Sequence, residues 1–308
     1  MGADVGMRAA RGSEYLDLVT RLAHRVRVEH PTAGLWEAAD LQWWWRSERS
    51  SDQIAQQFWL DDGGEPEAAI ILTDWSRTWG CDPIVLPSRA EAMLPTLWSK
   101  ARQRIDDLSL PSVEIMIGDD DEMLRDLVVA SGFEPSGETD VTTWMPAIDH
   151  PAVTAIADGF SLHDRLQSPD RPHHMVPRSG ERVAERLSET SLYRPDLDLW
   201  VENPDGQVAA YGLFWWDPTT RVGLVEPMRT EERFWRLGLS RHVLTTGLDR
   251  LAALGATRLK VSYVTDNPAA EGLYLTTGFR PDSTSTVFHR QEASAPSDPR
   301  RQQPSFPS

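Results

Sequence analysis

An internal repeat of strand and helix signals constrains this sequence more than any other feature. A Gly-Phe-x-Pro segment occurs twice, beginning at Gly132 and at Gly278, and each copy closes a stretch with helical spacing of apolar residues. The glycine can adopt the left-handed conformation that ends a helix, and the phenylalanine opens the next strand. A turn and a β-rich apolar run precede each copy, because Gly64 lies 68 residues before Gly132 and Gly206 lies 72 residues before Gly278. Two copies of one fold are therefore predicted.

The chain divides into three predicted parts. A strand-like stretch ends near Pro146 and gives way to Pro and Asp, which predicts one domain over residues 1–147 and a second over 158–290. The segment 291–308 has four prolines, four serines and no apolar periodicity, which predicts a disordered tail.

The second half has a readable order of elements. Its class is α+β (α/β), and in each half we expect a mixed, mostly antiparallel sheet flanked by helices. The predicted elements are a helix over 180–190, strands over 196–202, 208–216 and 222–228, a helix over 239–254, a strand over 259–264, a helix from Asn267 to Gly278 and a last strand over 284–289.

Composition excludes several classes of protein. The 308 residues contain 31 Lys and Arg against 47 Asp and Glu, a net charge of −16, which disfavours nucleic acid and anionic membranes as partners. The single cysteine, Cys81, cannot form an intramolecular disulfide or a thiolate zinc cluster, and no metal site is predicted. No apolar run is long enough to span a membrane, and the N-terminus lacks the layout of a signal peptide, so a cytoplasmic location is expected.

The segment 225–241 carries the first chemical signal. A predicted strand runs into a short loop that contains Gly238 and then into a helix, and five arginines accompany three glutamates between positions 221 and 241. Backbone N–H groups at such a helix start suit a pyrophosphate. The alternative is a solvated loop with ordinary helix charges.

The segment 267–279 carries the second signal. It reads Asn-Pro-Ala-Ala-Glu-Gly-Leu-Tyr-Leu-Thr-Thr-Gly-Phe. It resembles the Asn-x-x-Ala-x-x-x-Tyr-x-x-x-Gly-Phe block of the GNAT superfamily of N-acetyltransferases, and the loop before it resembles that family's acetyl-CoA pyrophosphate loop. Two positions depart from the family pattern, because Trp235 stands where Gln or Arg is usual and Ser240 where Gly or Ala is usual. Backbone groups do most of the phosphate binding, so acetyl-CoA binding is still expected.

The resemblance implies a role for each matching position. Tyr274 would be the general acid that protonates the departing thiolate, and Asn267 would contact the cofactor's arm. The remaining cofactor positions would be the strand backbone at Met228, Arg229 and Thr230 and the pyrophosphate loop at Arg236, Leu237, Gly238, Leu239, Ser240 and Arg241.

An amine must lose a proton before it attacks a thioester, so a base is needed. Glu226 is our candidate, acting directly or through water. Each assignment has a structural alternative: Glu226 could balance nearby arginines, Tyr274 could be a core residue, and Asn267 before Pro268 is a good helix cap. His173 and His174 lie in a proline-flanked loop, which predicts exposure.

The first half repeats the layout without these residues. Aligning Gly132 with Gly278 puts Val128 at the position of Tyr274 and Asp121 at that of Asn267, and no Gly-containing loop occurs in 84–100. We interpret it as a degenerate copy that lacks a cofactor loop. The tandem layout is similar to that of mycothiol synthase.

These observations predict an acetyl-CoA-dependent N-acetyltransferase that moves an acetyl group to a small-molecule or peptide amine by direct attack in a ternary complex. The alternative is a non-catalytic acyl-CoA-binding regulatory module. The acidic charge favours a cationic acceptor, and either a monomer or a dimer is compatible with the sequence.

Overall fold

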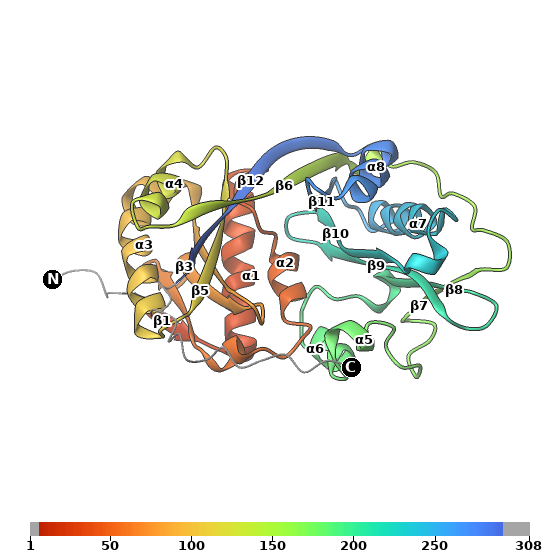
Figure 1. Cartoon of the computed structure of the whole chain (residues 1–308), viewed down its shortest axis with the longest axis horizontal. Coiled ribbons are helices and arrows are strands. Elements are labelled where there is room, and N and C mark those ends of the chain that lie inside the picture. Colours follow the sequence, from red (N-terminus) through yellow and green to blue (C-terminus); the bar gives the residue numbers. More distant parts are fainter. Residues whose placement is uncertain (1–5, 292–308) are drawn as a thin grey trace, which may run out of the picture.

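The centre of the molecule is one continuous twelve-stranded sheet, with helices on both faces (Figure 1). The computed structural model describes residues 6–291. The predicted tail 291–308 therefore lies outside the described residues, apart from Gln291 at the end of the last strand. The strand order is β1-β2-β3-β4-β5-β12-β6-β11-β10-β9-β8-β7. None of the described helices is long and apolar enough to cross a membrane.

The two halves contain the same succession of strands and helices. The first half contains β1 (Met7–Ala10), α1 (Gly12–Glu29), α2 (Ala38–Trp44), η1 (Ser50–Gln53), β2 (Gln56–Leu60), β3 (Pro66–Asp74), β4 (Trp79–Val85), η2 (Pro87–Arg89), α3 (Ala90–Asp107), β5 (Ser112–Gly118), α4 (Glu122–Val129), β6 (Glu134–Pro146) and η3 (Ala147–Asp149). The second half contains β7 (Ser161–Asp164), α5 (Val176–Ser179), α6 (Val183–Ser188), η4 (Pro195–Leu197), β8 (Asp198–Glu202), β9 (Val208–Asp217), β10 (Val222–Thr230), η5 (Glu232–Phe234), α7 (Leu239–Ala253), β11 (Arg258–Val264), α8 (Pro268–Thr277) and β12 (Arg280–Gln291).

The halves exchange their last strands. β6 closes the first half in sequence but pairs with β11 of the second half, whereas β12 pairs with β5 of the first half. The two exchanged strands also pair with each other and run side by side across the middle of the molecule (Figure 1). Separate sheets were expected from the sequence, but each half completes the sheet of the other.

The same local signals begin and end α4 in the first half and its counterpart α8 in the second half. The Asp121 side chain accepts a hydrogen bond from Leu124 N at the start of α4, and the Asn267 side chain accepts one from Ala270 N at the start of α8. The glycines that follow have φ values of +84° at Gly132 and +115° at Gly278, where an L side chain would be strained.

One predicted helix is wrong in its extent. The helix expected over 180–190 is observed as α6 (Val183–Ser188), which is shorter at both ends, and Gly180 with φ +89° instead ends the preceding short helix α5. A glycine in this conformation cannot continue an α-helix, so the chain restarts the helix at Val183.

The helices of the first half pack on both halves of the sheet. In the first half, α3 and α4 cover one face, and α1 and α2 cover the other. The cluster under α1 and α2 continues into the second half, where it takes in Trp200, Trp215 and Leu187 of α6. On the opposite face of the second half, α7 and α8 pack over Phe214 and Val225.

Close packing of α7 on β9 predicts a sensitive position. A Cβ on Gly247 would lie 2.2 Å from ring atoms of the fully buried Phe214. Gly247→Ala should therefore lower the free energy of unfolding by about 2 kcal/mol, the ordinary cost of overpacking, although alanine is the better helix former. Urea denaturation measures the change.

The matched control is Gly272→Ala in α8, where an added Cβ meets no atom within 4 Å. That substitution should raise the free energy of unfolding by about 0.5–1 kcal/mol, because it removes backbone freedom from the unfolded chain. Equal effects of the two substitutions would contradict the close approach of α7 to Phe214.

Candidate active site

The second half has an opening between two parallel strands. β10 pairs with β11 only over Val222–Leu224, whereas its pairing with β9 continues to Thr230 after a bulge between Val225 and Met228. Beyond Leu224, the edge of β10 that faces β11 has no strand partner in the described part of the chain. Met228, Arg229 and Thr230 lie on this edge, where an extended ligand can add like a further strand.

The loop between β10 and α7 presents backbone groups to this opening. Arg236 and Gly238 both have positive φ, +64° and +76°, and Gly238 stands at the N-cap of α7 without a side-chain cap. The first N–H groups of α7, at Leu239, Ser240 and Arg241, are thus left for an anion. Leu237 is exposed beside them.

Trp235 does not pack into the core. Its side chain is 59% exposed, and its Nε1 donates a hydrogen bond of 2.9 Å to the carbonyl of Thr230 at the end of β10. Arg241, in the first turn of α7, donates to Thr276 of α8. The residue that departs most from the family pattern therefore lies on the rim of the loop.

Two titratable side chains near the point where β10 and β11 part influence each other's charge state. Glu226 is partly buried on β10, and burial followed by the charge of Asp40 raises its pKa to about 7. Tyr274 of α8 is only 6% exposed, and its pKa is raised by burial and then by the charge of Glu226. A carboxyl with a pKa near neutral and a phenol that stays protonated therefore act on each other electrostatically, and these are the two kinds of group that base and acid catalysis require.

Part of this site comes from the first half. Helix α2 packs against β9 and β10. Three residues on α2 or just after it affect the pKa of Glu226. Asp40 raises the pKa of Glu226, whereas Arg46 and a hydrogen bond from Trp43 lower it. The guanidinium of Arg46 stacks on the Trp43 ring at 3.8 Å. Burial raises the pKa of Asp40 itself to about 6.

These first-half residues were not predicted from the sequence. The only signal was the run Trp43-Trp44-Trp45, which cannot turn all its rings to one face of a helix. In the structure Trp43 reaches Glu226, while the Trp45 indole donates a 2.6 Å hydrogen bond to Glu189 of the second half.

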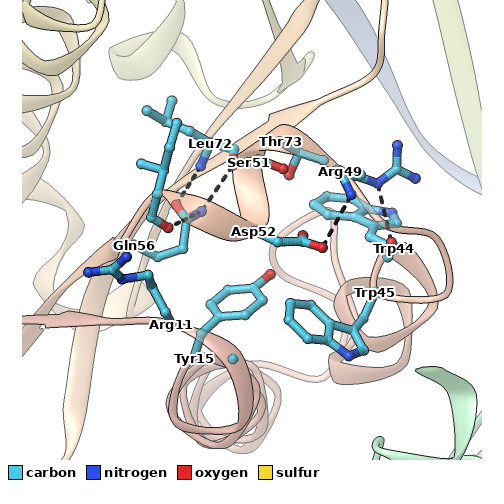
Figure 2. A pocket seen from close by; sticks show the side chains of 12 residues that line it. Arg11, Tyr15, Trp44, Trp45, Arg49, Ser51, Asp52, Gln56, Leu72 and Thr73 are labelled. Carbon is cyan, nitrogen blue, oxygen red and sulfur yellow. Dashed lines mark hydrogen bonds between the residues drawn. The ribbon is translucent and has the colours of Figure 1, made fainter. Parts of the chain in front are cut away.

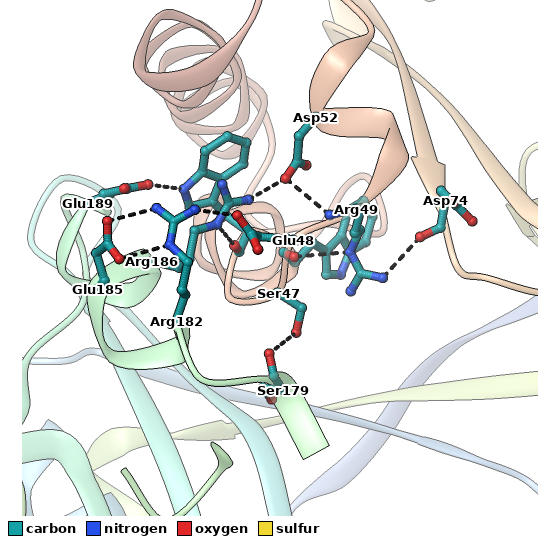
Figure 3. Close-up of polar contacts among 12 residues, drawn as sticks. Ser47, Glu48, Arg49, Asp52, Asp74, Ser179, Arg182, Glu185, Arg186 and Glu189 are labelled. Carbon is teal, nitrogen blue, oxygen red and sulfur yellow. Dashed lines mark hydrogen bonds and ion pairs between the residues drawn. The ribbon is translucent and has the colours of Figure 1, made fainter. Parts of the chain in front are cut away.

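A polar cluster anchors the segment after α2 to the second half (Figure 3). Arg186 of α6 pairs with Asp52 at 2.7 Å and donates to the Trp45 carbonyl at 2.7 Å. The Ser47 hydroxyl donates to the carbonyl of Ser179 at 3.0 Å. Arg186 and Asp52 are both largely buried, so these contacts hold α2 over β10.

A hollow at the start of α1 is too small to be a substrate site. Tyr15, Trp45, Arg49 and Asp52 are among its lining residues, and Figure 2 shows their side chains around it. Its volume of about 20 Å³ holds one water molecule.

The two neighbouring histidines differ from expectation. His173 and His174 are buried rather than exposed. The Nδ1 of His173 accepts the Met175 N–H at 3.2 Å, so its Nε2 carries the proton that Asp198 accepts at 2.9 Å. That nitrogen has no lone pair for a metal ion, although His173, His174 and Asp198 lie close together.

Asn267 and Cys81 have structural surroundings. Asn267 caps α8 and is exposed, and its contact with a cofactor stays a prediction. Cys81 is fully buried, and burial raises the pKa of its thiol, which is the opposite of what a thiolate nucleophile needs.

Among known protein families, one family model matches the second half of the chain. Residues 161–279 match the model of the acetyltransferase (GNAT) family. The second half of this chain is similar to the GNAT family. The matched segment contains the parted strands, the loop before α7 and Tyr274. No curated protein matches the chain.

Solved structures show that the GNAT fold occurs twice in this chain. A tandem GNAT protein from the clavulanic acid biosynthesis pathway superposes with a TM-score of 0.67 at 14% identity, covering 92% of this chain and 98% of that one. A GCN5-related N-acetyltransferase from Sphaerobacter thermophilus gives a TM-score of 0.62 at 15% identity, covering 92% and 95%. The chain therefore has the GNAT fold in both halves, and the family model matches the second half.

Proposed function

We propose that this protein is an acetyl-CoA-dependent N-acetyltransferase whose second half carries out the reaction. The observation that carries the proposal is the strand edge left free where β10 parts from β11, together with a Glu226 carboxyl whose charge raises the pKa of the Tyr274 phenol. Glu226 is the proposed base and Tyr274 the proposed acid.

The residues around the opening fit acetyl-CoA. The free edge of β10 at Met228, Arg229 and Thr230 offers backbone groups to an extended pantetheine arm. The uncapped start of α7 offers N–H groups to a pyrophosphate, with Arg236 and Arg241 beside it. Arg229 is already paired with Glu231 at 3.2 Å, so we assign the phosphate charge to the other two arginines.

The proposed reaction needs no covalent acyl-enzyme. Acetyl-CoA supplies an acetyl group activated as a thioester. Glu226 takes one proton from the acceptor ammonium, directly or through water, and returns it to solvent. Tyr274 donates its proton to the sulfur as the C–S bond breaks and the C–N bond forms, and it is restored by the second proton that the nitrogen loses.

The carboxylates around the site favour a cationic acceptor. The charges of Asp40 and Asp140 both raise the pKa of Glu226, and burial followed by the charge of Glu138 raises the pKa of Asp140 to about 6. An ammonium group relieves this repulsion when it binds. A small-molecule or peptide amine is therefore the proposed acceptor class.

Titration calorimetry with acetyl-CoA tests the cofactor site. The wild-type protein should bind acetyl-CoA at one site, and Arg236→Ala combined with Arg241→Ala should weaken binding about 10- to 100-fold, because two charge-assisted contacts to phosphate are lost. Arg102→Ala, on the exposed side of α3, is the matched control and should bind as the wild type does.

Two results count against this part of the proposal. The first is an absence of acetyl-CoA binding by the wild-type protein. The second is equal binding by the double variant, with circular dichroism confirming that it is folded. A cofactor site elsewhere in the chain would then have to be sought.

A further inference from the structure

The first half contains a pocket of its own at the equivalent opening. β4 pairs with β5 only at Trp79 and Gly80, so these strands part much as β10 and β11 do. The pocket beside them has a volume of about 540 Å³, which is in the range of sites for small organic molecules. Its walls come from the end of α1, the segment 30–36, β4, β5, the start of α4 and residues 282–284 of β12.

A buried carboxyl in this pocket is the counterpart of Glu226. Asp82-Pro83 occupies in β4 the place that Glu226-Pro227 occupies in β10, just beyond the residues that still pair with the next parallel strand. Asp82 is 7% exposed, and burial raises its pKa to about 7, as it does for Glu226. Each carboxyl also accepts a hydrogen bond from an indole, Asp82 from Trp36 at 3.1 Å.

Asp82 has unused hydrogen-bonding capacity toward the pocket. The Trp36 bond goes to Oδ1, and no hydrogen bond to Oδ2 is found among the described residues. A carboxylate accepts several hydrogen bonds, and an ionised one that is buried with a single partner is costly. A donor that also carries positive charge would relieve that cost.

The other charged residues that line the pocket also favour a positively charged ligand. Asp120, Asp121 and Asp282 line it, and His30 is the one basic residue in its lining. The segment between β4 and α3 is a short turn, η2, and offers no glycine loop for phosphate. Phosphates would therefore be repelled, whereas cations would be attracted.

The pocket has apolar walls and a firmly held rim. Val26, Ile84, Met116 and Leu124 line it together with the Trp36 ring. The segment 30–36 is tied to both halves: Arg27 and Arg258 donate to the Pro31 carbonyl at 2.7 Å each, and Lys260 donates to the Leu35 carbonyl at 2.6 Å. A preformed pocket costs little ordering when a ligand binds.

We propose that this first-half pocket binds a cationic amine with an apolar body, held by the Asp82 carboxylate beside the Trp36 ring. The ligand keeps its ammonium proton and is not acetylated there, because the first half lacks the loop that would bind the phosphates of acetyl-CoA. The proposal concerns a second site and does not depend on the activity of the second half.

The test uses benzylamine as the probe and benzyl alcohol as its uncharged match. The full chain carrying Glu226→Gln serves as the background, so that the carboxyl of the second-half site is absent. We expect saturable binding of benzylamine, followed through the indole N–H signal of Trp36, and binding of benzyl alcohol at least tenfold weaker. Adding Asp82→Asn, which keeps the side chain's shape, should weaken benzylamine binding at least tenfold.

Asp107→Asn is the control, because it removes the same charge from an exposed position at the end of α3. It should leave benzylamine binding unchanged. Three results would overturn the proposal: no saturable binding in the Glu226→Gln background, equal affinity for benzyl alcohol, or no effect of Asp82→Asn in a protein whose thermal denaturation shows that it is folded. Each is separable from a failure of acetyl-CoA binding by the second half.

Discussion

Replacing Tyr274 with phenylalanine is expected to lower kcat roughly 100- to 1,000-fold while the affinity for acetyl-CoA stays unchanged. The phenol is buried on α8, and the pKa shift caused by burial and by Glu226 keeps it protonated. Without it, the thiolate must leave unassisted, whereas the ring still fills its place against Phe279. Release of the CoA thiol with a panel of amines measures kcat, and calorimetry measures the affinity.

Tyr263→Phe is the matched control for this substitution. Its ring lies 6.2 Å from that of Tyr274 on the neighbouring strand β11, so it tests the loss of a nearby hydroxyl with no proposed role. Turnover that survives Tyr274→Phe would remove the acid from the mechanism. Acetyl-CoA binding without thiol release from any amine, in the wild-type protein, would instead support an acyl-CoA-binding regulatory module.

The pH dependence of kcat/KM should reveal Glu226. The base acts only when ionised, and burial with the nearby Asp40 charge raises its pKa to about 7. Activity should therefore fall as the pH drops below about 7 and level off above it. Glu226→Gln should lower kcat/KM roughly 100-fold or more above pH 7 and remove this limb of the profile. Using one acceptor throughout makes the ionisation of the amine the same for every variant, so its effect cancels when the pH profiles of the variants are compared.

Asp40→Asn provides the diagnostic comparison. Removing this charge takes away one of the causes that raise the pKa of Glu226, so the rising limb should move to lower pH while the plateau is kept. A limb that stays in place in Glu226→Gln would show that another group is the base. A limb that does not move in Asp40→Asn would show that α2 does not act on the site.

The elements of the second half were predictable because their signals are local. Asn267 before Pro268 and Gly278 after the helix were enough to place α8, since a cap and a left-handed glycine act within a few residues. The strands β9, β10 and β11 followed from their apolar runs and turns. The role of Gly180 was missed, because the sequence does not show the positive φ with which this glycine ends α5.

The partners of the last strands were not predictable. β6 and β12 each end one half of the sequence, and nothing in the residues of either strand states which sheet it joins. Backbone hydrogen bonds form equally well with any strand in register, so the exchange depends on how the two sheets meet.

The sequence by itself determined the repeated layout, the resemblance of the second half to the GNAT family and the positions of Glu226 and Tyr274, because motifs and helix ends depend on residues close together in the chain. The tertiary structure alone decided that α2 lies over β10 and brings Asp40 and Trp43 to Glu226. The tertiary structure also decided that Asp82 lies in the wall of a pocket and not on the open surface. Burial and charge pairing arise only when distant segments pack together, and these are the effects that set the pKa of a carboxyl.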